Sequence, residues 1–476
     1  MGHVFRCVAL AQMLQSKYHV VFLIRADATV EEAIRREGFE YRIISSEHPS
    51  DEAQEIRSIL PTNSTFILDG YAFDAAYQQS IIDHLSTLIY IDDLCAGEQM
   101  ADIIINHAPG IDANAYQLRA YSQLLTGLPY ALLRKEFLEE RVLKNTDYRK
   151  SVLLSLGAAD ERNHSARMLR MIQSEYPDLV ITVLTSSANK HLDQLREEEQ
   201  KKPNLLRLLV NGTAEDVAQS MLSSSAIICT ASSISIEACA LRIPMICGMS
   251  AQNQLGIYNG LVSAHACIGI GNLDTLEQNV FSAALSDVLH RPELRDDMIR
   301  NQAILLDKKS NLRIAEAIDT AQKHAESTWW RLARKQDMQL FYAWTNDPDV
   351  RANSFQSEPI PLESHRSWFE RMMNDAHAAL YVFFCGREAV GQLRLQMNHK
   401  RCTISYSVAK EARGRGYGKW ILEQSEALAK QRWNAVEELV GHVKPSNEAS
   451  NRVFKALGFE TEHVSSEEII YRRFIA

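Results

Sequence analysis

The sequence lacks several features that mark specialised classes of protein. No apolar run approaches the roughly 20 residues needed to cross a bilayer, and no signal-peptide pattern is present. The net charge is −9, and an acidic surface repels phosphates, which argues against a general nucleic-acid binder. There is also no internal repeat and no low-complexity tract. We therefore expect a cytoplasmic protein without a membrane or nucleic-acid partner.

Cysteine is sparse and scattered. The eight cysteines lie at positions 7, 95, 229, 239, 247, 267, 385 and 402, mostly within apolar runs. No CxxC pair and no metal-ligand spacing occurs. The sequence therefore predicts reduced core thiols and no metal site.

What the sequence does contain is a long alternation of strand and helix patterns. The 476 residues are enough for roughly two to four domains. Short apolar runs alternate with amphipathic segments up to Glu326, which predicts parallel sheets covered on both faces. The pattern restarts after Lys150, so we expect two doubly wound α/β halves, residues 1–145 and 146–326. Sheets of this kind bind ligands at the carboxyl ends of their strands, so we expect a cleft between the halves.

The pattern changes near Ser327. Ser327–Gln336 is expected to be a helical connector, and residues 327–476 as a whole to form a smaller α+β domain. Within it, the sequence predicts helices at Met338–Thr345 and Glu363–Asp375, followed by antiparallel strands. A further helix at Gly416–Arg432, a strand at Glu438–Val443 and a helix at Glu448–Leu457 are expected before the last strand.

One stretch, Ser225–Gln254, has the pattern of a nucleotide site. A buried strand at Ala226–Cys229 runs into a small-residue turn, and a helix carrying Glu237 follows. A helix N-terminus exposes backbone N–H groups that suit a phosphate. A glutamate one turn further on can accept hydrogen bonds from both hydroxyls of a ribose.

The strongest single motif is the loop Arg413–Gly418, which has three glycines and two arginines between a strand and a helix. Glycine lets backbone N–H groups approach a pyrophosphate, and the helix adds its positive end. The loop resembles the R-x-x-G-x-G acetyl-CoA loop of GNAT acetyltransferases. Asn447–Ser450 and Phe454–Phe459 likewise resemble the family's ending, N-x-x-S…F/Y-x-x-x-G-F.

This resemblance implies acetyl-CoA as co-substrate. The residues implied to bind it are Val408 on the strand edge, the loop residues Arg413, Gly414, Arg415, Gly416, Tyr417 and Gly418, and then Asn447 and Ser450. Related enzymes often use a tyrosine as general acid where this chain has Phe454, so the proton donor is left unassigned. Glu438 and His442 are candidate bases, with a structural role for His442 as the alternative.

The first two-thirds resembles another family through an ordered set of segments. Gly2-His3-Val4-x-Arg6 matches the G-H-x-x-R signature of the UDP-sugar hydrolases of the pseudaminic acid pathway. The segments that agree in order after it are Leu68–Tyr71, Ile91–Leu94, Asp102–Asn106, Tyr130–Phe137, Ser155–Asp160, Ser233…Glu237 and Asn253–Gln254. The match runs from about Gly2 to Leu306 and includes the related spore-coat polysaccharide proteins.

The hydrolases resemble the GT-B transferase that adds GlcNAc in peptidoglycan synthesis, with water in place of a sugar acceptor. The resemblance therefore implies a GT-B-like pair of Rossmann-type domains, with His3 as the base that activates water. The residues implied to contact the UDP-sugar are Arg6, Tyr71, Gly157, Ser233, Glu237, Asn253 and Gln254. For Tyr71 a half-buried structural role is an equal alternative. Asp92 and Asp93 are expected to form a turn and a helix start.

Two departures from the hydrolase pattern are evident. The family has a strand and a glycine-rich loop before Gly-His, whereas this sequence begins at Met1, so we expect the first strand to be missing. Some glycines near the phosphates are replaced, by Ala231 and Ser232 before Glu237 and by Ala158 after Gly157. The added Cβ atoms could crowd the phosphates.

Together the two resemblances predict a bifunctional enzyme of nonulosonic acid biosynthesis. The C-terminal domain would acetylate the amino group of a UDP-4-amino sugar. The N-terminal part would then release UDP from the UDP-2,4-diacetamido-2,4,6-trideoxy sugar by water attack at C1. Two alternatives remain open: a GT-B glycosyltransferase with an appended acetyltransferase, or an inactive UDP-sugar-binding scaffold that serves the acetyltransferase.

Overall fold

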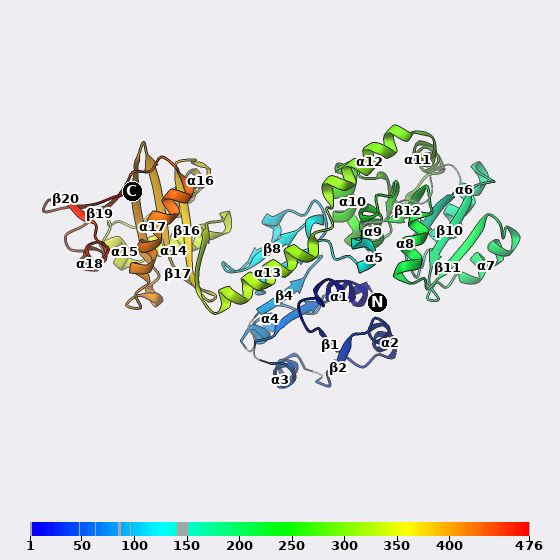
Figure 1. The fold of residues 1–476 in the computed structure, drawn as a ribbon, viewed down its shortest axis with the longest axis horizontal. Coiled ribbons are helices and arrows are strands. Elements are labelled where there is room, and N and C mark those ends of the chain that lie inside the picture. The colour runs from blue at the N-terminus through cyan, green and yellow to red at the C-terminus, as the bar shows by residue number, and fades with distance from the viewer. Residues whose placement is uncertain are drawn as a thin grey trace. The chain divides into compact units, whose positions relative to one another are not determined.

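The computed structural model describes residues 2–46, 48–61, 63–83, 87–95, 97–139 and 151–475. The chain divides into two compact units, whose elements are labelled in Figure 1. Unit 1 comprises Met1–Gln117 and Gln123–Asp319, and unit 2 comprises Leu118–Ser122 and Thr320–Ala476. The predicted domain boundary at residues 145 and 146 lies outside the described residues. No described helix is both long and apolar enough to span a membrane.

The first half of unit 1 contains two parallel sheets. One pairs β1 (Val21–Ile24) with β2 (Glu40–Ile43). The other has the order β3-β4-β6-β8, formed by Thr65–Asp69, Thr87–Ile91, Ile103–Asn106 and Gln123–Thr126. The helices of this half are α1 (Gly2–Leu14), α2 (Ala28–Arg36), α3 (Pro49–Ile59), α4 (Ala75–Ile82) and α5 (Lys135–Leu138), and the two-residue strands are β5 (Glu98–Gln99) and β7 (Gln117–Leu118).

The second half of unit 1 is built on one six-stranded parallel sheet with the order β11-β10-β9-β12-β13-β14. Its strands are β9 (Ser151–Ser155), β10 (Val180–Thr185), β11 (Leu206–Val210), β12 (Ala226–Thr230), β13 (Met245–Met249) and β14 (Ile268–Asn272). Its helices are α6 (His164–Glu175), α7 (Leu192–Lys201), α8 (Ala214–Leu222), α9 (Ser233–Ala240), α10 (Leu255–Ser263), α11 (Gln278–His290) and α12 (Pro292–Leu305). Helix α13 (Ser310–Ala325) begins in unit 1 and its last residues belong to unit 2. All five residues of β12 are buried, as expected for a parallel strand covered on both faces. The predicted alternation and parallel pairing are therefore confirmed.

Unit 2 has a seven-stranded sheet with the order β15-β16-β17-β18-β19-β21-β20. Its strands are β15 (Thr328–Leu332), β16 (Ala378–Cys385), β17 (Glu388–Asn398), β18 (Arg401–Val408), β19 (Glu438–Val443), β20 (Glu460–Val464) and β21 (Ile469–Phe474). Its helices after α13 are α14 (Met338–Thr345), α15 (Pro348–Ala352), α16 (Leu362–Asn374), α17 (Tyr417–Arg432) and α18 (Glu448–Ala456). Only β18 and β19 pair in parallel; the other neighbours are antiparallel.

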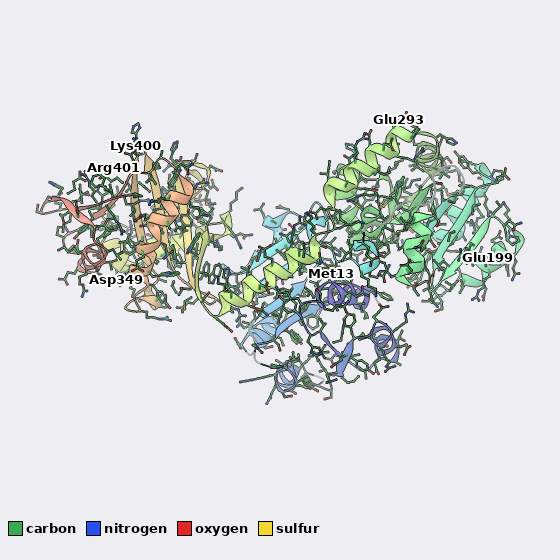
Figure 2. The ribbon with its side chains drawn as sticks, in the orientation of Figure 1. Met13, Glu199, Glu293, Asp349, Lys400 and Arg401 are labelled. Atoms are coloured by element: carbon green, nitrogen blue, oxygen red, sulfur yellow. The ribbon has the colours of Figure 1, made fainter. Side chains whose placement is uncertain are left out.

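The helices of unit 2 cover opposite faces of this sheet. Trp420 of α17 meets Phe383 of β16 edge to face, with ring centroids 5.0 Å apart. On the other face, the guanidinium of Arg394 on β17 lies over the ring of Trp368 on α16, at 5.7 Å. At the β17–β18 turn, Lys400 and Arg401, both labelled in Figure 2, pair with the carboxylates that begin β19.

The helical connector predicted at Ser327–Gln336 is wrong, because Thr328–Leu332 forms the edge strand β15. This strand pairs antiparallel with β16, and Trp329 stacks on Phe384 with ring centroids 4.1 Å apart. A β-branched residue followed by two tryptophans favours an extended strand on a partly buried surface. The sequence reading overlooked that preference.

The five residues Leu118–Ser122 belong to unit 2 although they lie far from it in the sequence. Arg331 donates hydrogen bonds to the carbonyl of Ala120 at 3.2 and 2.6 Å, and Arg334 donates to the carbonyl of Ser122 at 2.6 Å. Asp337 accepts two further hydrogen bonds from Arg331. A charged donor therefore fixes each of these two loop carbonyls.

Candidate functional site

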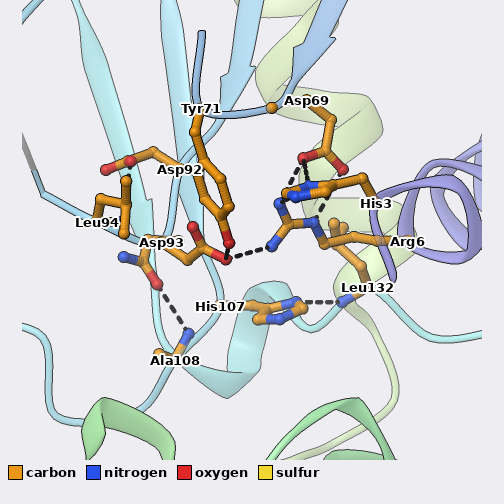
Figure 3. A network of polar contacts seen from close by, with 12 residues as sticks. His3, Arg6, Asp69, Tyr71, Asp92, Asp93, Leu94, His107, Ala108 and Leu132 are labelled. Carbon is orange, nitrogen blue, oxygen red and sulfur yellow. Dashed lines mark hydrogen bonds and ion pairs between the residues drawn. The ribbon is translucent and has the colours of Figure 1, made fainter. Parts of the chain in front are cut away.

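His3 and Asp69 form a histidine–carboxylate pair in unit 1 (Figure 3). His3 lies on α1, and its Nδ1 is 2.7 Å from Oδ1 of Asp69 at the end of β3. Nη2 of Arg6 also lies 3.1 Å from this Nδ1. In the tautomer that donates from Nδ1 to Asp69, Nε2 keeps its lone pair. The Asp69 side chain is 1 % exposed and that of His3 36 %. The imidazole is thus held by a buried partner while part of it reaches solvent.

Arg6 joins this pair to a second carboxylate. Its Nε donates to Asp69 at 2.9 Å, and its Nη1 donates to Asp93 at 3.1 Å. Burial lowers the pKa of Arg6, but hydrogen bonds and charge from Asp69 and Asp93 outweigh this effect and raise it overall. The guanidinium is therefore permanently charged beside His3.

Tyr71 completes the cluster seen in Figure 3. Its hydroxyl donates to Asp93 at 3.3 Å, and its ring meets that of His3 edge to face at 4.8 Å. Burial and the charge of Asp93 raise the pKa of Tyr71, and a hydrogen bond with Asn253 acts the other way. The side chain is 54 % exposed. Two predicted site residues from different halves of unit 1, Tyr71 and Asn253, are thus brought together.

Asp92 and Asp93 have different roles. Asp92 accepts hydrogen bonds from the amides of Leu94 and Cys95, so the predicted turn is present. The predicted helix start is wrong, because the next elements in the described residues are the strands β5 and β6. Asp93 instead turns toward Arg6.

A second histidine, His107, was not singled out by the sequence analysis. Its Nδ1 accepts a hydrogen bond from the Leu132 amide at 3.2 Å. Burial lowers the pKa of His107 to about 4, and the positive charge of Arg6 adds to the effect. His107 is therefore neutral near pH 7.

Glu237 lies on α9, one turn after β12, and is buried. Arg134 donates to both of its oxygens, from Nε at 2.8 Å and from Nη2 at 2.9 Å. Burial lowers the pKa of Arg134, but the charge and hydrogen bonds of Glu237 raise it overall. This two-pronged geometry fixes the Glu237 carboxylate and leaves each oxygen one further lone pair.

The loops after β9 and β12 meet at the point where the strand order of the six-stranded sheet reverses. These strands are neighbours, with Ser155 opposite Cys229. Gly157 follows β9 with a φ of +108°, and a Cβ there would meet nothing within 4 Å. Ser233, at the start of α9, is exposed. In doubly wound sheets this position is where ligands bind.

Gln254 folds back on its own loop after β13. Its Oε1 accepts from the Ser250 amide at 2.8 Å, and its Nε2 lies 3.4 Å from the Ser250 hydroxyl. It therefore orders the loop that also carries Asn253.

In unit 2, the glycine-rich loop presents unpaired backbone donors. Gly414 and Gly416 have φ values of +76° and +87°, and a Cβ at either would meet nothing within 4 Å. Within the described part of the chain, the amides of residues 414–418 make no hydrogen bond to another protein group. Helix α17 begins within this loop, at Tyr417, so its positive end faces the same space. The loop therefore presents backbone donors at a helix N-terminus, and anion binding there stays a prediction.

The two arginines of this loop are already held by carboxylates. Arg413 pairs with Asp347 and, at 2.6 Å, with Asp349. Arg415 lies 3.3 Å from Glu388 and is half exposed. The loop therefore offers a ligand its backbone amides more directly than its guanidinium groups.

Next to the loop, β18 separates from β19. The two strands pair from Arg401–Glu438 to Ile404–Gly441 and no further, although β18 continues to Val408. The last residues of β18 therefore have one edge without a partner strand among the described residues. An extended ligand with amide groups can pair with such an edge.

Helix α18 adds polar side chains near this gap. Asn447 is its N-cap and accepts from the Ser450 amide at 3.1 Å. The Ser450 hydroxyl lies 3.3 Å from that of Tyr406 on β18. Burial raises the pKa of Tyr406, with the Ser450 hydrogen bond opposing it, so the phenol stays protonated. Phe454 is buried and stacks on Tyr471 with ring centroids 5.0 Å apart.

The two candidate bases on β19 differ sharply. Glu438 is buried and paired with Arg401 at 2.7 Å and with Arg472, which makes it a structural ion pair. His442 is exposed, and its Nδ1 lies 2.7 Å from Oε1 of Glu468. His442 follows the last pair between β18 and β19 and is therefore beside the gap.

The family model described as "Acetyltransferase (GNAT) domain" matches residues 329–460. Residues 329–460 form a GNAT acetyltransferase domain. The protein is therefore an enzyme with an acetyltransferase domain, and this family is consistent with acetyl-CoA as donor and an amine as acceptor.

Two relatives cover different shares of the chain. An uncharacterized protein of Methanocaldococcus jannaschii, MJ1062, is 23% identical over 381 residues, which is 78% of this chain and 75% of that protein. The GNAT match spans residues 329–460, so most of the 381 residues aligned with MJ1062 lie outside the GNAT domain. The uncharacterized N-acetyltransferase YfmK of Bacillus subtilis is 27% identical over 139 residues, 29% of this chain and 89% of that protein.

Two solved structures are similar to part of the chain. A domain from Methanocaldococcus jannaschii has 20% identity and a TM-score of 0.29, covering 31% of this chain and 99% of its own. The spermidine N-acetyltransferase of Vibrio cholerae, in complex with CoA and spermine, has 15% identity and a TM-score of 0.28. It covers 31% of this chain and 95% of its own.

The residues of the GNAT domain fit the acetyl donor. The free amides at 414–418 suit a pyrophosphate, and the open edge of β18 suits the amides of a pantetheine arm. When bound, acetyl-CoA would supply an activated acetyl group.

The sequence analysis missed three charged residues near the two sites: Asp69, Arg134 and Glu468. Asp69 and Arg134 lay inside quoted motifs, but nothing in their spacing pointed to His3 or Glu237.

We expect Gly416→Ala to weaken CoA binding about 10-fold or more, because a side chain at a φ of +87° is strained and the loop would shift. Isothermal titration calorimetry of the full chain with CoA measures this. All six tryptophans lie between residues 329 and 433, inside the GNAT domain, so tryptophan fluorescence reports whether the domain remains folded.

Gly458→Ala is the matched control. Gly458 follows α18 with a φ of +74° and open space around it, outside the loop. It should lose stability to a similar extent and keep wild-type CoA affinity. Equal loss of affinity in both variants would contradict a specific role for the loop.

Proposed function

We propose that the protein is a bifunctional nucleotide-sugar enzyme. Its GNAT domain acetylates the amino group of a UDP-4-amino sugar. Unit 1, a GT-B-like pair of Rossmann-type domains, then releases UDP from the UDP-2,4-diacetamido-2,4,6-trideoxy sugar by water attack at C1. The product of the first reaction is the substrate of the second, which gives a reason for joining the two in one chain.

The observation that carries the hydrolase part is the His3–Asp69 pair. With Nδ1 donating to this buried carboxylate, Nε2 of His3 would take a proton from water. Asp69 is a positioning residue in this scheme, because it acts through His3. Tyr71 and Asn253, which lie together beside the pair, would border the sugar.

The departing diphosphate needs electrostatic stabilisation, which the switch point of the six-stranded sheet can provide. Gly157 leaves room for phosphate oxygens, and the start of α9 at Ser233 offers backbone amides. Arg134 holds Glu237 so that its remaining lone pairs can accept from the ribose hydroxyls. Arg6, fixed beside His3, would keep positive charge near the reacting bond.

The acetyl transfer needs a base for the acceptor amine and an acid for the departing thiolate. His442, oriented by Glu468, would take the proton as the amine nitrogen attacks the thioester carbonyl. Tyr406 would return a proton to the thiolate sulfur, since its hydroxyl is protonated and pairs with Ser450 one turn before Phe454. This places the acid on β18 rather than at Phe454.

Asp69 and His3 are tested by UDP release from the diacetamido nucleotide sugar, measured on the full chain. His3→Gln should slow release about 100-fold or more because the base is lost. Asp69→Asn should lower kcat by less than His3→Gln does and leave the KM for the nucleotide sugar unchanged, because Asp69 only orients the imidazole.

His19→Gln is the control for this experiment, because His19 is an exposed histidine that pairs with Glu40 on the surface of unit 1. It should release UDP at the wild-type rate. If the wild-type chain binds the UDP-sugar but does not cleave it, the result would support the scaffold alternative. Release that depends on a sugar acceptor would support the glycosyltransferase.

His442 and Glu468 are tested by acetyl transfer to the UDP-4-amino sugar. We expect His442→Gln to lower kcat about 100-fold with the KM for acetyl-CoA unchanged. Glu468→Gln should lower kcat less, again with the KM for acetyl-CoA unchanged, because Glu468 only orients His442. His377→Gln, which removes an exposed histidine paired with Asp375, should leave both parameters unchanged. A wild-type kcat in His442→Gln would exclude it as the base.

A further inference from the structure

Arg394 of the GNAT domain has no anionic partner among the residues that the structure describes. Arg394 lies in the middle of β17, largely enclosed beneath α16, with its guanidinium over the Trp368 ring. Within the described residues it makes no ion pair, and no neighbouring charge affects its pKa, which burial alone lowers. Enclosing an unpaired guanidinium costs free energy, which a bound anion would offset.

Three other arginines of the domain differ from Arg394 because each has a carboxylate partner. Arg331 pairs with Asp337, Arg413 with Asp347, and Arg472 with Glu438. The domain therefore has carboxylates available for its structural arginines. Arg394 is different because its surroundings supply neutral donors instead of a counter-charge.

These donors share a face of the sheet with Arg394. Ser405 of β18 is directly opposite Arg394. Two residues further along the strands, Gln396 and Thr403 form another opposed pair on the same face. Residues directly opposite each other in an antiparallel pair have neighbouring side chains. Ser405 and Gln396 are exposed. One guanidinium beside hydroxyl and amide donors matches the several oxygens of a phosphate group.

The same face leads to the proposed base. Thr403 is paired with Val440 across β18 and β19, so His442, two residues further along β19, faces the same side as Val440. Arg394, Ser405 and His442 therefore lie on one face of three successive strands. An acceptor whose phosphate bound at Arg394 would extend toward His442.

We propose that Arg394 binds a phosphate group of the amine acceptor, so that the GNAT domain selects phosphate-bearing amines. This rests on the acetyltransferase part of the proposed function and goes beyond it by assigning a specificity residue. A diphosphate-linked amino sugar meets the requirement, whereas a polyamine does not.

Binding is tested first, without turnover, on the full chain saturated with CoA so that the glycine-rich loop is filled. Inorganic pyrophosphate should shift the tryptophan fluorescence saturably, because Trp368 stacks on Arg394. Arg394→Gln should weaken this response about 10- to 100-fold, the loss expected for one charged hydrogen-bonding partner. Arg366→Gln removes an exposed arginine of α16 that pairs with Glu363 and should respond as the wild type.

Turnover is tested with two acceptors, the UDP-4-amino sugar and the same amino sugar without UDP. Arg394→Gln should raise the KM for the nucleotide sugar about 10- to 100-fold and leave the KM for acetyl-CoA and the kinetics of the free sugar unchanged.

Acetyl transfer with equal KM values in variant and wild type would overturn the assignment of Arg394 while the proposed function stood. Pyrophosphate binding that needs Arg394, without transfer to either amine, would uphold the anion site and contradict the proposed acceptor. An unaltered pyrophosphate response in Arg394→Gln would overturn the assignment outright.

Discussion

The separation of β18 from β19 is the constraint on which the acetyltransferase site depends. Pairing stops at Ile404 and Gly441, and Gly441 is a position where no side chain fits, because a Cβ would approach the Phe454 ring to 2.3 Å. Phe454 is itself held by Tyr471. The core of the domain thus fixes where the two strands part. The open edge of β18, the free amides before α17 and the hydroxyl pair of Tyr406 and Ser450 all border the resulting gap.

The two candidate catalytic histidines are held in the same physical way. Each has its Nδ1 at 2.7 Å from a carboxylate, supplied by Asp69 in unit 1 and by Glu468 in unit 2. Such a partner selects one tautomer and one ring orientation, so that the other nitrogen can exchange a proton. The difference lies in the surroundings: Asp69 is buried and shared with Arg6, whereas Glu468 is about one-third exposed.

Local features were predictable from the sequence, and distant contacts were not. The glycine-rich loop was predictable because its left-handed backbone requires glycine at positions 414 and 416. The strand at Thr328–Leu332 was misread although its Thr-Trp-Trp run favours an extended strand, because the strand β16 that pairs with it lies far along the chain. Asp69 is 66 residues from His3, and Arg394 stands out because no carboxylate among the described residues pairs with it. No periodicity or spacing carries information of that kind.

Acetyl-CoA would bind to the amides of residues 414–418 and to the open edge of β18. Hydrogen–deuterium exchange of the full chain, with and without CoA, tests this binding. We expect rapid exchange at 414–418 in the free protein, because these amides have no acceptor among the described residues. With CoA we expect strong protection there and at the end of β18, with little change in β15 and β16. Unchanged exchange at 414–418 under saturating CoA would rule out this binding site.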